Sequence, residues 1–367
     1  MKIDQFAAGT SLEVTWQDGS TTEFPFIWLR DNAQDPDSYD ARSNQREVFT
    51  AQLPQDIRPV DISLAEAGAA VEIHWPDKIE PVTYPAEFLL RAAGQQRQEY
   101  VLAERELWQA DLEAPRLSLS YLQKEVPSPG ASLVRALAHQ GFALIEHCDG
   151  GEPVVQQIAD MLGYVRETIF GGIWSFEADE AMADSAYTPR LLRPHTDATY
   201  SHDAPGVQIL LCTANDSEGG ESIMVDGFRV AHDLAEARPD IYETLCSIPI
   251  EGEYCGDGVV LRAERPVFRL NAAGQLVQVS FNNYDRSRRL LSAEDSQRLY
   301  EAIAVVDEYF NDPAYQWRHR LTAGEALVFD NWRVLHGRTA YRGMRKMSGA
   351  YTNREDLESR YRALASA

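Results

Sequence analysis

Many short apolar runs, separated by turn residues, fill the second half of the chain from about residue 195 onward. They are VQILLCT, ESIMVD, VFRLN, LVQVSFNN and EALVFD. Runs of this length with polar turns between them are typical of antiparallel strands in a sandwich or jelly roll. Helical patterns interrupt the runs at about 228–246 and 292–310, and Ser292 is a good capping residue for the second helix. We therefore predict an α+β fold with a β-sandwich core.

The first hundred residues contain a weak internal repeat. LEVTWQDGSTTEFPFIWLRD over 12–31 is similar to VEIHWPDKIEPVTYPAEFLLRA over 71–92. Each copy has alternating residues that end in Trp, then a turn with Asp, an aromatic–Pro pair and a short apolar patch. This order predicts a β-hairpin followed by a short helix in each copy. We expect a small β-rich N-terminal domain over 1–95.

The middle of the chain marks the boundary to a larger domain. Residues 96–130 are polar and end in the breaker PSPG, so we expect a linker there. Helices are expected at 131–140 and 153–162, because each is an apolar pattern that ends at a Gly. The larger domain is expected to span 131–367.

Charge and composition exclude several classes of partner. The 367 residues carry a formal net charge of −23, which would repel a nucleic-acid backbone. No apolar run approaches the roughly 20 residues that cross a bilayer, so we expect no membrane association. The four Cys form no CxxC pair, and the N-terminal residues lack a secretory pattern. We expect reduced thiols and a cytoplasmic protein.

The stretch RPHTDATY (193–200) holds a candidate metal site. On a strand, residues two apart point to the same side, so His195 and Asp197 could reach one ion. The best third ligand is His336 in DNWRVLHGR, which follows the apolar run EALVFD. Two His and one carboxylate form a facial triad that leaves open positions on Fe(II).

Other histidines compete for this role, and a bare His-x-Asp occurs often by chance. A lone His is more often structural than a ligand. The competing residues are His74, His139, His147, His202, His232 and His319.

The motifs around the site resemble one family of enzymes. HTDATYSHDAPGVQILLC, GGES, VDGF, FNN, FDNWRVLHGR and GAY occur in this order, and WLRDN precedes them at 28–32. Together they are similar to the γ-butyrobetaine and trimethyllysine dioxygenase branch of the Fe(II)/2-oxoglutarate oxygenases. The resemblance implies a double-stranded β-helix (jelly roll) catalytic domain with flanking helices, and His195, Asp197 and His336 as iron ligands. It also implies a homodimer.

The resemblance implies 2-oxoglutarate as co-substrate, with O₂. An Arg would pair with the distal carboxylate of 2-oxoglutarate through two hydrogen bonds. The candidates after the second His are Arg338, Arg342 and Arg345, and counting back from GAY selects Arg345 while Arg342 stays open. Ser222 in GGES lies where the family has a hydroxyl that hydrogen-bonds the co-substrate.

Members of this branch bind a trimethylammonium group. Such a cation cannot donate a hydrogen bond, so a box of aromatic faces suits it. By resemblance, the box positions are Phe170, Trp174, Tyr187 and Tyr351, with Phe170 in place of the usual Tyr.

The other end of the substrate is anionic in this family. Asn282 and Asn283 lie where the family contacts a carboxylate. Asp184 replaces an Asn of the γ-butyrobetaine enzymes and would repel a carboxylate. Arg286 and Arg288 follow FNN, and extra arginines suit a doubly charged phosphonate. We therefore predict hydroxylation of 2-(trimethylammonio)ethylphosphonate, with γ-butyrobetaine as the alternative.

The related enzymes bind structural zinc through a Cys-rich segment after WLRDN and a later His, but this chain has no Cys there, so no zinc is expected. A non-catalytic metal-binding or ligand-binding jelly roll is the alternative from another class, because a fold alone does not set a function.

Overall fold

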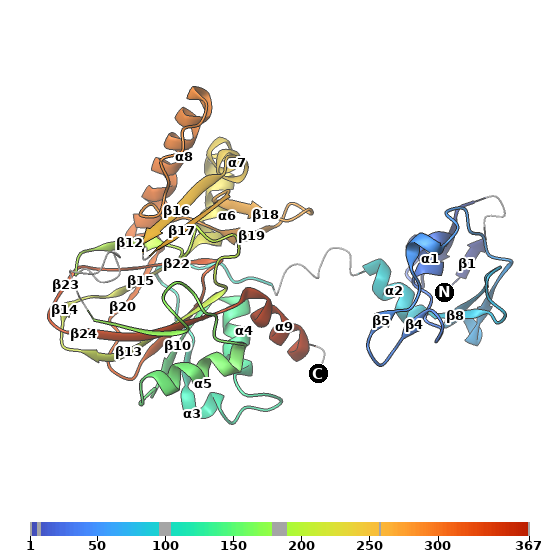
Figure 1. The fold of residues 1–367 in the computed structure, drawn as a ribbon, viewed down its shortest axis with the longest axis horizontal. Coiled ribbons are helices and arrows are strands. Elements are labelled where there is room, and N and C mark those ends of the chain that lie inside the picture. The colour runs from blue at the N-terminus through green and yellow to red at the C-terminus, as the bar shows by residue number, and fades with distance from the viewer. Residues whose placement is uncertain (1, 6–8, 95–103, 178–188, 257, 366–367) are drawn as a thin grey trace. The chain divides into compact units, whose positions relative to one another are not determined.

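The computed structural model describes residues 2–5, 9–94, 104–177, 189–256 and 258–365 (Figure 1). The chain divides into two compact units, Met1–Glu99 and Tyr100–Ala367. No helix in the described ranges combines the length and the apolar character that crossing a membrane requires.

The smaller unit folds each copy of the sequence repeat as a hairpin followed by a helix. The first copy contains β2 (Ser11–Thr15), β3 (Thr21–Pro25) and α1 (Phe26–Asp31), and β1 (Lys2–Gln5) precedes it and pairs with β2. The second contains β7 (Ala70–His74), β8 (Val82–Pro85) and α2 (Ala86–Gly94), and β6 (Asp61–Ala65) precedes it and pairs with β7. Between them lie β4 (Tyr39–Asp40), β5 (Gln45–Arg46) and 3-10 turns at Thr50–Gln52 and Glu66–Gly68.

A shared core joins the two copies. Trp75 and Tyr84 are fully buried in it. The indole Nε1 of Trp75 donates to the hydroxyl of Tyr84 at 3.0 Å, and that hydroxyl donates to the backbone oxygen of Leu29 at 2.8 Å. The second copy is therefore tied to the helix of the first.

The larger unit is a sandwich of two sheets, which confirms the jelly-roll core. One sheet contains β9 (Arg116–Ser118), β10 (Phe142–Glu146), β11 (Ile173–Glu177), β13 (Val207–Asn215), β21 (Ala326–Asp330) and β24 (Arg345–Thr352). The other contains β12 (Leu192–His195), β15 (Ser222–Asp226), β20 (Gln316–His319) and β22 (Val334–Arg338). Their orders are β11-β24-β13-β21-β10-β9 and β12-β22-β15-β20.

Helices cover the outer faces of both sheets (Figure 1). On the six-stranded sheet lie α4 (Ala131–His139), α5 (Glu152–Leu162) and α9 (Arg354–Ala365), with the short α3 (Leu119–Leu122) beside α4. On the four-stranded sheet lie α6 (Gly227–Ala237), α7 (Pro239–Ser247) and α8 (Ala293–Asn311). A third cluster that includes Phe142, Met224 and Phe329 fills the space between the sheets.

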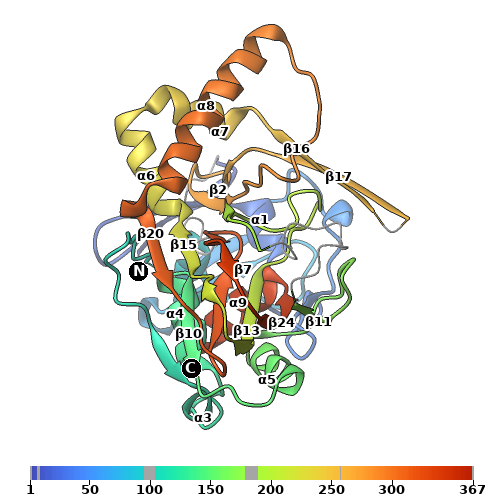
Figure 2. The same cartoon turned by 90° about the vertical axis from the view of Figure 1, so that its left-hand side faces the viewer.

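Short strand pairs complete the unit. They are β14 (Glu218–Gly219) with β23 (Tyr341–Arg342), β16 (Ile250–Gly256) with β17 (Val259–Arg265), and β18 (Phe268–Leu270) with β19 (Leu276–Val279), besides a 3-10 turn at Pro313–Tyr315. Figure 2 shows β16 and β17 running out from the sandwich as a hairpin.

Two sequence predictions differ from the structure. The helix expected over 228–246 is two helices, because Pro239 begins a new one. The linker expected over 96–130 is wrong for its described part, residues 104–130. Trp108 and Leu122 are buried in the larger unit, and β9 pairs with β10. A few apolar residues anchor this segment to the larger unit. The segment is polar on average, so its composition does not indicate these contacts.

Candidate active site

Two imidazoles face each other on neighbouring strands. His195 ends β12, His336 lies in the middle of β22, and the two residues are direct partners in the antiparallel register. Their ring centroids are 4.3 Å apart. Strand pairing therefore brings together two histidines that are far apart in the sequence.

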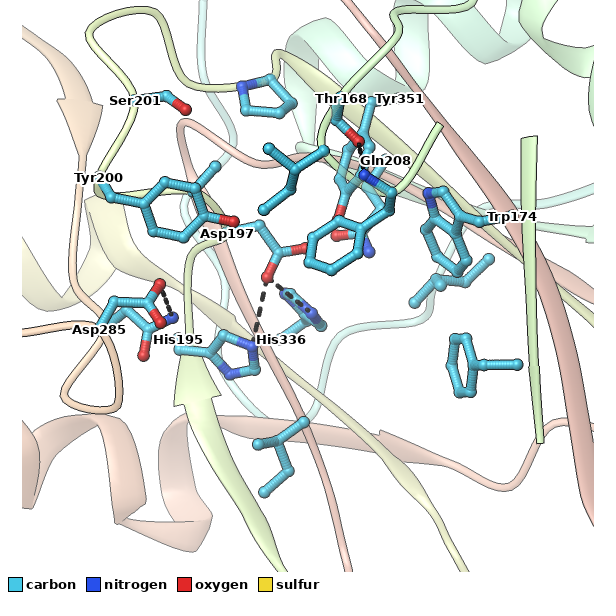
Figure 3. A pocket seen from close by; sticks show the side chains of 18 of the residues that line it. Thr168, Trp174, His195, Asp197, Tyr200, Ser201, Gln208, Asp285, His336 and Tyr351 are labelled. Carbon is cyan, nitrogen blue, oxygen red and sulfur yellow. Dashed lines mark hydrogen bonds and ion pairs between the residues drawn. The ribbon is translucent and has the colours of Figure 1, made fainter. Parts of the chain in front are cut away.

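Asp197 completes the group from the turn that follows β12. Nε2 of His195 lies 3.4 Å from Oδ1 of Asp197, and Nε2 of His336 lies 3.8 Å from the same oxygen. One ligand atom from each residue lies within 4.8 Å of the other two. Figure 3 shows the carboxylate of Asp197 facing both imidazoles. The predicted convergence is confirmed, although Asp197 follows the strand rather than lying on it.

The side chain of Asn331 holds this turn in place. The backbone N–H of Asp197 donates to Oδ1 of Asn331 at 2.8 Å, and Nδ2 of Asn331 donates back to the carbonyl of Asp197 at 3.2 Å. The next residue, Ala198, has a φ of 55°, which is uncommon for a residue with a Cβ. The backbone is thus held in a less favoured conformation where it presents the carboxylate.

The hydrogen bonding of His195 prepares its other nitrogen for a metal ion. Nδ1 of His195 lies 2.8 Å from the carbonyl oxygen of Arg193, and a carbonyl can only accept, so Nδ1 carries the hydrogen. Nε2, which faces Asp197, is then the nitrogen with the free lone pair in the neutral ring. A hydrogen bond such as that from Nδ1 to the carbonyl of Arg193 is the usual way in which a metal-binding imidazole is oriented.

Burial and mutual charge set the protonation of the triad. Burial lowers the pKa of His336 to about 4, so this ring is neutral at physiological pH. Burial raises the pKa of Asp197, but both imidazoles and the hydroxyl of Tyr351 lower it by more than burial raises it. The net shift of this pKa is downward. Burial lowers the pKa of His195, whereas Asp197 raises it more. The carboxylate of Asp197 thus attracts positive charge to the triad. Either a proton or a metal ion can provide that charge. The donor set fits Fe(II).

A cavity of about 390 Å³ adjoins the triad, which is within the usual size range of small-molecule sites. Arg345 and Ser222 line it, and each is only 5% exposed. The side chain of Arg345 bonds no carboxylate among the described residues, and its Nε is buried without a hydrogen-bond partner there. Arg342 is exposed and does not line the cavity, whereas Arg338 does.

Aromatic rings form one wall of this cavity. Trp174 lies 5.7 Å from Tyr351 and 5.5 Å from Phe176, measured between ring centroids. A Cβ on Gly349 would overlap the indole of Trp174, so the glycine makes room for this ring. Phe170 also lines the cavity.

Only some of the residues predicted to contact the anionic end of the substrate lie at the cavity beside the triad. Asn282 lines the cavity. Asn283 and Arg286 line a separate, much smaller cavity instead. Arg288 is exposed and lines neither of the two. Asp184 and Tyr187 lie outside the described residues.

Several further residues line the cavity that the sequence had not indicated, among them Tyr200, Tyr254, Gln208 and Asp285. Tyr200 lies 5.3 Å from Tyr254 between ring centroids, and Gln208 and Asp285 line the same cavity. The spacing from Asp197 could have indicated Tyr200, which ends the motif HTDATY. Tyr254 had no local signal, because it comes from the β16–β17 hairpin.

Two imidazoles and one carboxylate on a jelly roll are the arrangement of the non-haem iron oxygenases that use 2-oxoglutarate. Comparison with known proteins leads to the same class. Residues 104–351 match the sequence model described as "Taurine catabolism dioxygenase TauD, TfdA family". The chain belongs to this family of Fe(II)- and 2-oxoglutarate-dependent dioxygenases. Residues 4–90 match "Gamma-butyrobetaine hydroxylase-like, N-terminal".

Several named relatives align over nearly the whole chain. Trimethyllysine dioxygenase of Meyerozyma guilliermondii is 31% identical, over 97% of this chain and 94% of the relative. Mitochondrial trimethyllysine dioxygenase of Gallus gallus is 30% identical, over 97% and 86%. Gamma-butyrobetaine dioxygenase of a Pseudomonas species is 30% identical, over 97% and 93%.

Solved structures share the fold. A taurine dioxygenase from Burkholderia xenovorans superposes with a TM-score of 0.51 at 14% identity, covering 68% of this chain and 91% of that one. An asparagine oxygenase with Fe(II) and succinate has a TM-score of 0.50 at 17% identity, covering 61% and 80%. At these identities the likeness concerns the fold.

Proposed function

We propose that this dioxygenase hydroxylates a small molecule with a trimethylammonium group at one end and a carboxylate at the other, of the trimethyllysine or γ-butyrobetaine type. The observation that carries the proposal is the aromatic wall beside the metal triad, where Trp174 and Tyr351 lie 5.7 Å apart. A quaternary ammonium has no N–H group, and the faces of aromatic rings attract it. The names of the aligned relatives support this substrate class.

Four groups would hold the metal and the co-substrate. His195, Asp197 and His336 would bind Fe(II), and the buried cation of Arg345 would pair with the distal carboxylate of 2-oxoglutarate. The iron centre supplies the oxidising power that places one oxygen atom of O₂ in a substrate C–H bond while 2-oxoglutarate becomes succinate and CO₂. Ser222 lines the same cavity, and its hydroxyl would donate a hydrogen bond to the co-substrate.

The aromatic wall would bind the cationic end. We assign Phe170, Trp174 and Tyr351 to this role, and Tyr200 and Tyr254 extend the wall. Tyr187 is a fourth position of the box by resemblance. Closely placed rings also exclude water, and a desolvated cation gains more from an aromatic face.

The polar end of the cavity favours a carboxylate over a phosphonate. The phosphonate prediction rested on Arg286 and Arg288, and neither lines the cavity beside the triad. Asn282 does line it and would donate to a carboxylate. Asp285 also lines it and accepts a hydrogen bond of 2.8 Å from Asn282. A carboxylate at this place suits the α-ammonium group of trimethyllysine, which γ-butyrobetaine lacks.

A panel of substrates tests the proposal. Trimethyllysine, γ-butyrobetaine and 2-(trimethylammonio)ethylphosphonate are each incubated with the Fe(II)-loaded chain, 2-oxoglutarate and O₂, and succinate and hydroxylated product are quantified together. We expect tight coupling of the two products for at least one carboxylate and poor coupling for the phosphonate. If no trimethylammonium compound is hydroxylated, the aromatic wall has another role.

We also propose that the chain forms a homodimer, as the resemblance implies, and that it is cytoplasmic. Light scattering of the purified chain measures the mass of the assembly, and a mass of one chain at all concentrations would contradict the dimer.

A further inference from the structure

A second cavity adjoins the first, and Asn282 lines both. Its volume is about 10 Å³, which is room for one particle of the size of a water molecule. The polar residues that line it are Thr199, Arg265, Ser280, Asn282, Asn283 and Arg286. Two of them are cations, the others are hydroxyls and amides, and none of the described lining residues carries a carboxylate.

Arg265 is a buried cation that forms no ion pair among the described residues. It ends β17 and is only 8% exposed. Its Nη2 donates to the carbonyl oxygen of Ser201, while Nη1 is buried and has no hydrogen-bond partner within the described ranges. Burial, together with the positive charge of Arg269, lowers the pKa of Arg265 to about 10, and the exposed carboxylate of Asp203 offsets only part of this shift. A buried charge without a partner is unfavourable, and this chain is otherwise rich in acids.

A second unsatisfied group faces the same place. Oγ1 of Thr199 is buried without a hydrogen-bond partner among the residues that the structure describes. Thr199 belongs to the turn that presents Asp197. Gly252 of β16 packs directly on this turn, since a Cβ there would lie 2.7 Å from the carbonyl carbon of Thr199 and 2.8 Å from its Oγ1.

Arg286 adds positive charge at the edge of the cavity. Its guanidinium lies 5.1 Å from the centre of the Tyr300 ring. Its backbone forms an isolated bridge with Gly252, which places the residue beside β16. The side chain forms no ion pair in the described part of the chain. Two arginines thus line a space that holds one small particle.

We propose that this cavity binds one monatomic anion, chloride under ordinary conditions, between Arg265 and Thr199. A substrate carboxylate or phosphonate has several heavy atoms and exceeds the available space, whereas a water molecule fits but leaves the buried cation of Arg265 without an ion-pair partner. The bound anion would accept hydrogen bonds from Nη1 of Arg265 and Oγ1 of Thr199. It would thereby link β17 to the turn that carries Asp197. The anion would stabilise the metal site in this way without coordinating the iron.

Thermal unfolding in different sodium salts tests the proposal in solution. The chain is unfolded in sodium chloride, bromide or gluconate at equal ionic strength and under anaerobic conditions. The transition of the larger unit is followed, and it is recognised because Fe(II) and 2-oxoglutarate raise its midpoint. We expect a saturable rise of about 2 °C in chloride and bromide relative to gluconate. Arg265→Gln removes this rise. Arg262→Gln is the matched control, because it removes an exposed arginine from the same strand and keeps the halide effect.

Crystals soaked in bromide give an independent test on the unaltered chain. An anomalous peak within about 3.5 Å of Nη1 of Arg265 is the expected result. An ordered water with no bromide peak, or equal unfolding midpoints in all three salts, overturns the proposal. If Arg265→Gln does not fold, Thr199→Val replaces it, since this variant keeps the side-chain volume and removes one donor. It should need several-fold more chloride for the same rise, and an unchanged chloride dependence contradicts the site.

Discussion

The hydroxyl of Tyr351 donates a hydrogen bond of 2.7 Å to Oδ2 of Asp197. The two residues come from different sheets of the sandwich, because Tyr351 lies in β24 and Asp197 follows β12. The same tyrosine ring lines the aromatic wall of the cavity. One side chain thus contacts both the proposed place of the trimethylammonium group and the carboxylate that faces both imidazoles.

Replacing Tyr351 with Phe tests this link. The ring stays, so the Michaelis constant for substrate should change little. The lost hydrogen bond leaves Asp197 less well oriented, and we expect iron affinity to fall by about 10- to 100-fold. Anaerobic Fe(II) titration measures the affinity, and Tyr300→Phe on the exposed face of α8 is the control. Unchanged iron binding in Tyr351→Phe would show that the bond is not needed.

Removal of the carboxylate should abolish turnover. Asp197→Ala leaves two imidazoles for the metal, so we expect O₂-dependent succinate formation to fall by at least about a hundredfold. Chelation of the wild-type chain should have the same effect, and added Fe(II) should reverse it. Asp203→Ala removes an exposed acid that follows the same turn and should keep most of the activity. Full succinate formation by Asp197→Ala would remove this residue from the ligand set.

Two arginines that lie near each other in the sequence are the candidates for binding the distal carboxylate of 2-oxoglutarate. Arg345 is buried in the cavity and Arg342 is exposed. Arg345→Gln loses a charge-assisted pair worth about 1.5 to 3 kcal/mol, so the Michaelis constant for 2-oxoglutarate should rise by about 10- to 150-fold. Arg342→Gln should leave it within about twofold of the wild-type value. The reverse order of the two effects would identify Arg342 as the anchor.

The aromatic wall can be tested with a matched pair of ligands. Trp174→Leu keeps an apolar side chain but removes the ring face. The affinity for a trimethylammonium substrate should fall by about 2- to 30-fold, corresponding to about 0.5 to 2 kcal/mol. The neutral analogue with a tert-butyl group should lose much less, and inhibition constants for both give the comparison. Equal losses for the two ligands would mean that Trp174 acts by shape alone.

Ion pairs in the smaller unit make its stability depend on pH. Nη2 of Arg30 lies 2.7 Å from Oδ2 of Asp77, and Nζ of Lys78 lies 2.5 Å from Oδ1 of Asp35. The hydrogen bond from Arg30 lowers the pKa of Asp77 below its unfolded value of about 3.9. The contribution of the pair to stability is therefore present above pH 4 and is lost as the pH falls through the lower folded pKa.

Thermal unfolding of this unit between pH 7 and 3 measures the effect, and Arg30→Gln should flatten the dependence. A chelator should not change the midpoint at pH 7, because we expect no zinc in this unit. A chelator-sensitive midpoint would contradict that expectation.

Much of the metal site could be predicted from short stretches of sequence. The motif around His195 fixes two ligands within three positions, and the apolar run before His336 indicates that this residue lies on or next to a strand. The hairpin-and-helix repeat of the first hundred residues is likewise a local pattern, set by Trp, turn and Pro positions. Side-chain period and turn chemistry are enough for features of this kind.

Contacts between distant segments could not be obtained in this way. Tyr254 reaches the cavity because its hairpin folds over the turn after β12. Arg286 turns toward a different cavity because its backbone pairs with Gly252. Both placements depend on how long-range strand pairs form, and no pattern within either segment encodes them. The arginines after FNN therefore suggested a phosphonate that the cavity beside the triad does not favour.

The distribution of the site over both sheets has a consequence for how this enzyme can change. The imidazoles lie on paired strands, and Arg345 begins a strand of the opposite sheet. Trp174 and Tyr351 of the proposed substrate wall also lie on strands, but other parts of that wall come from connections such as the β16–β17 hairpin. Selection can therefore rebuild those connections for a new substrate while the oxidising centre is inherited intact, so a new specificity need not begin with a new catalyst.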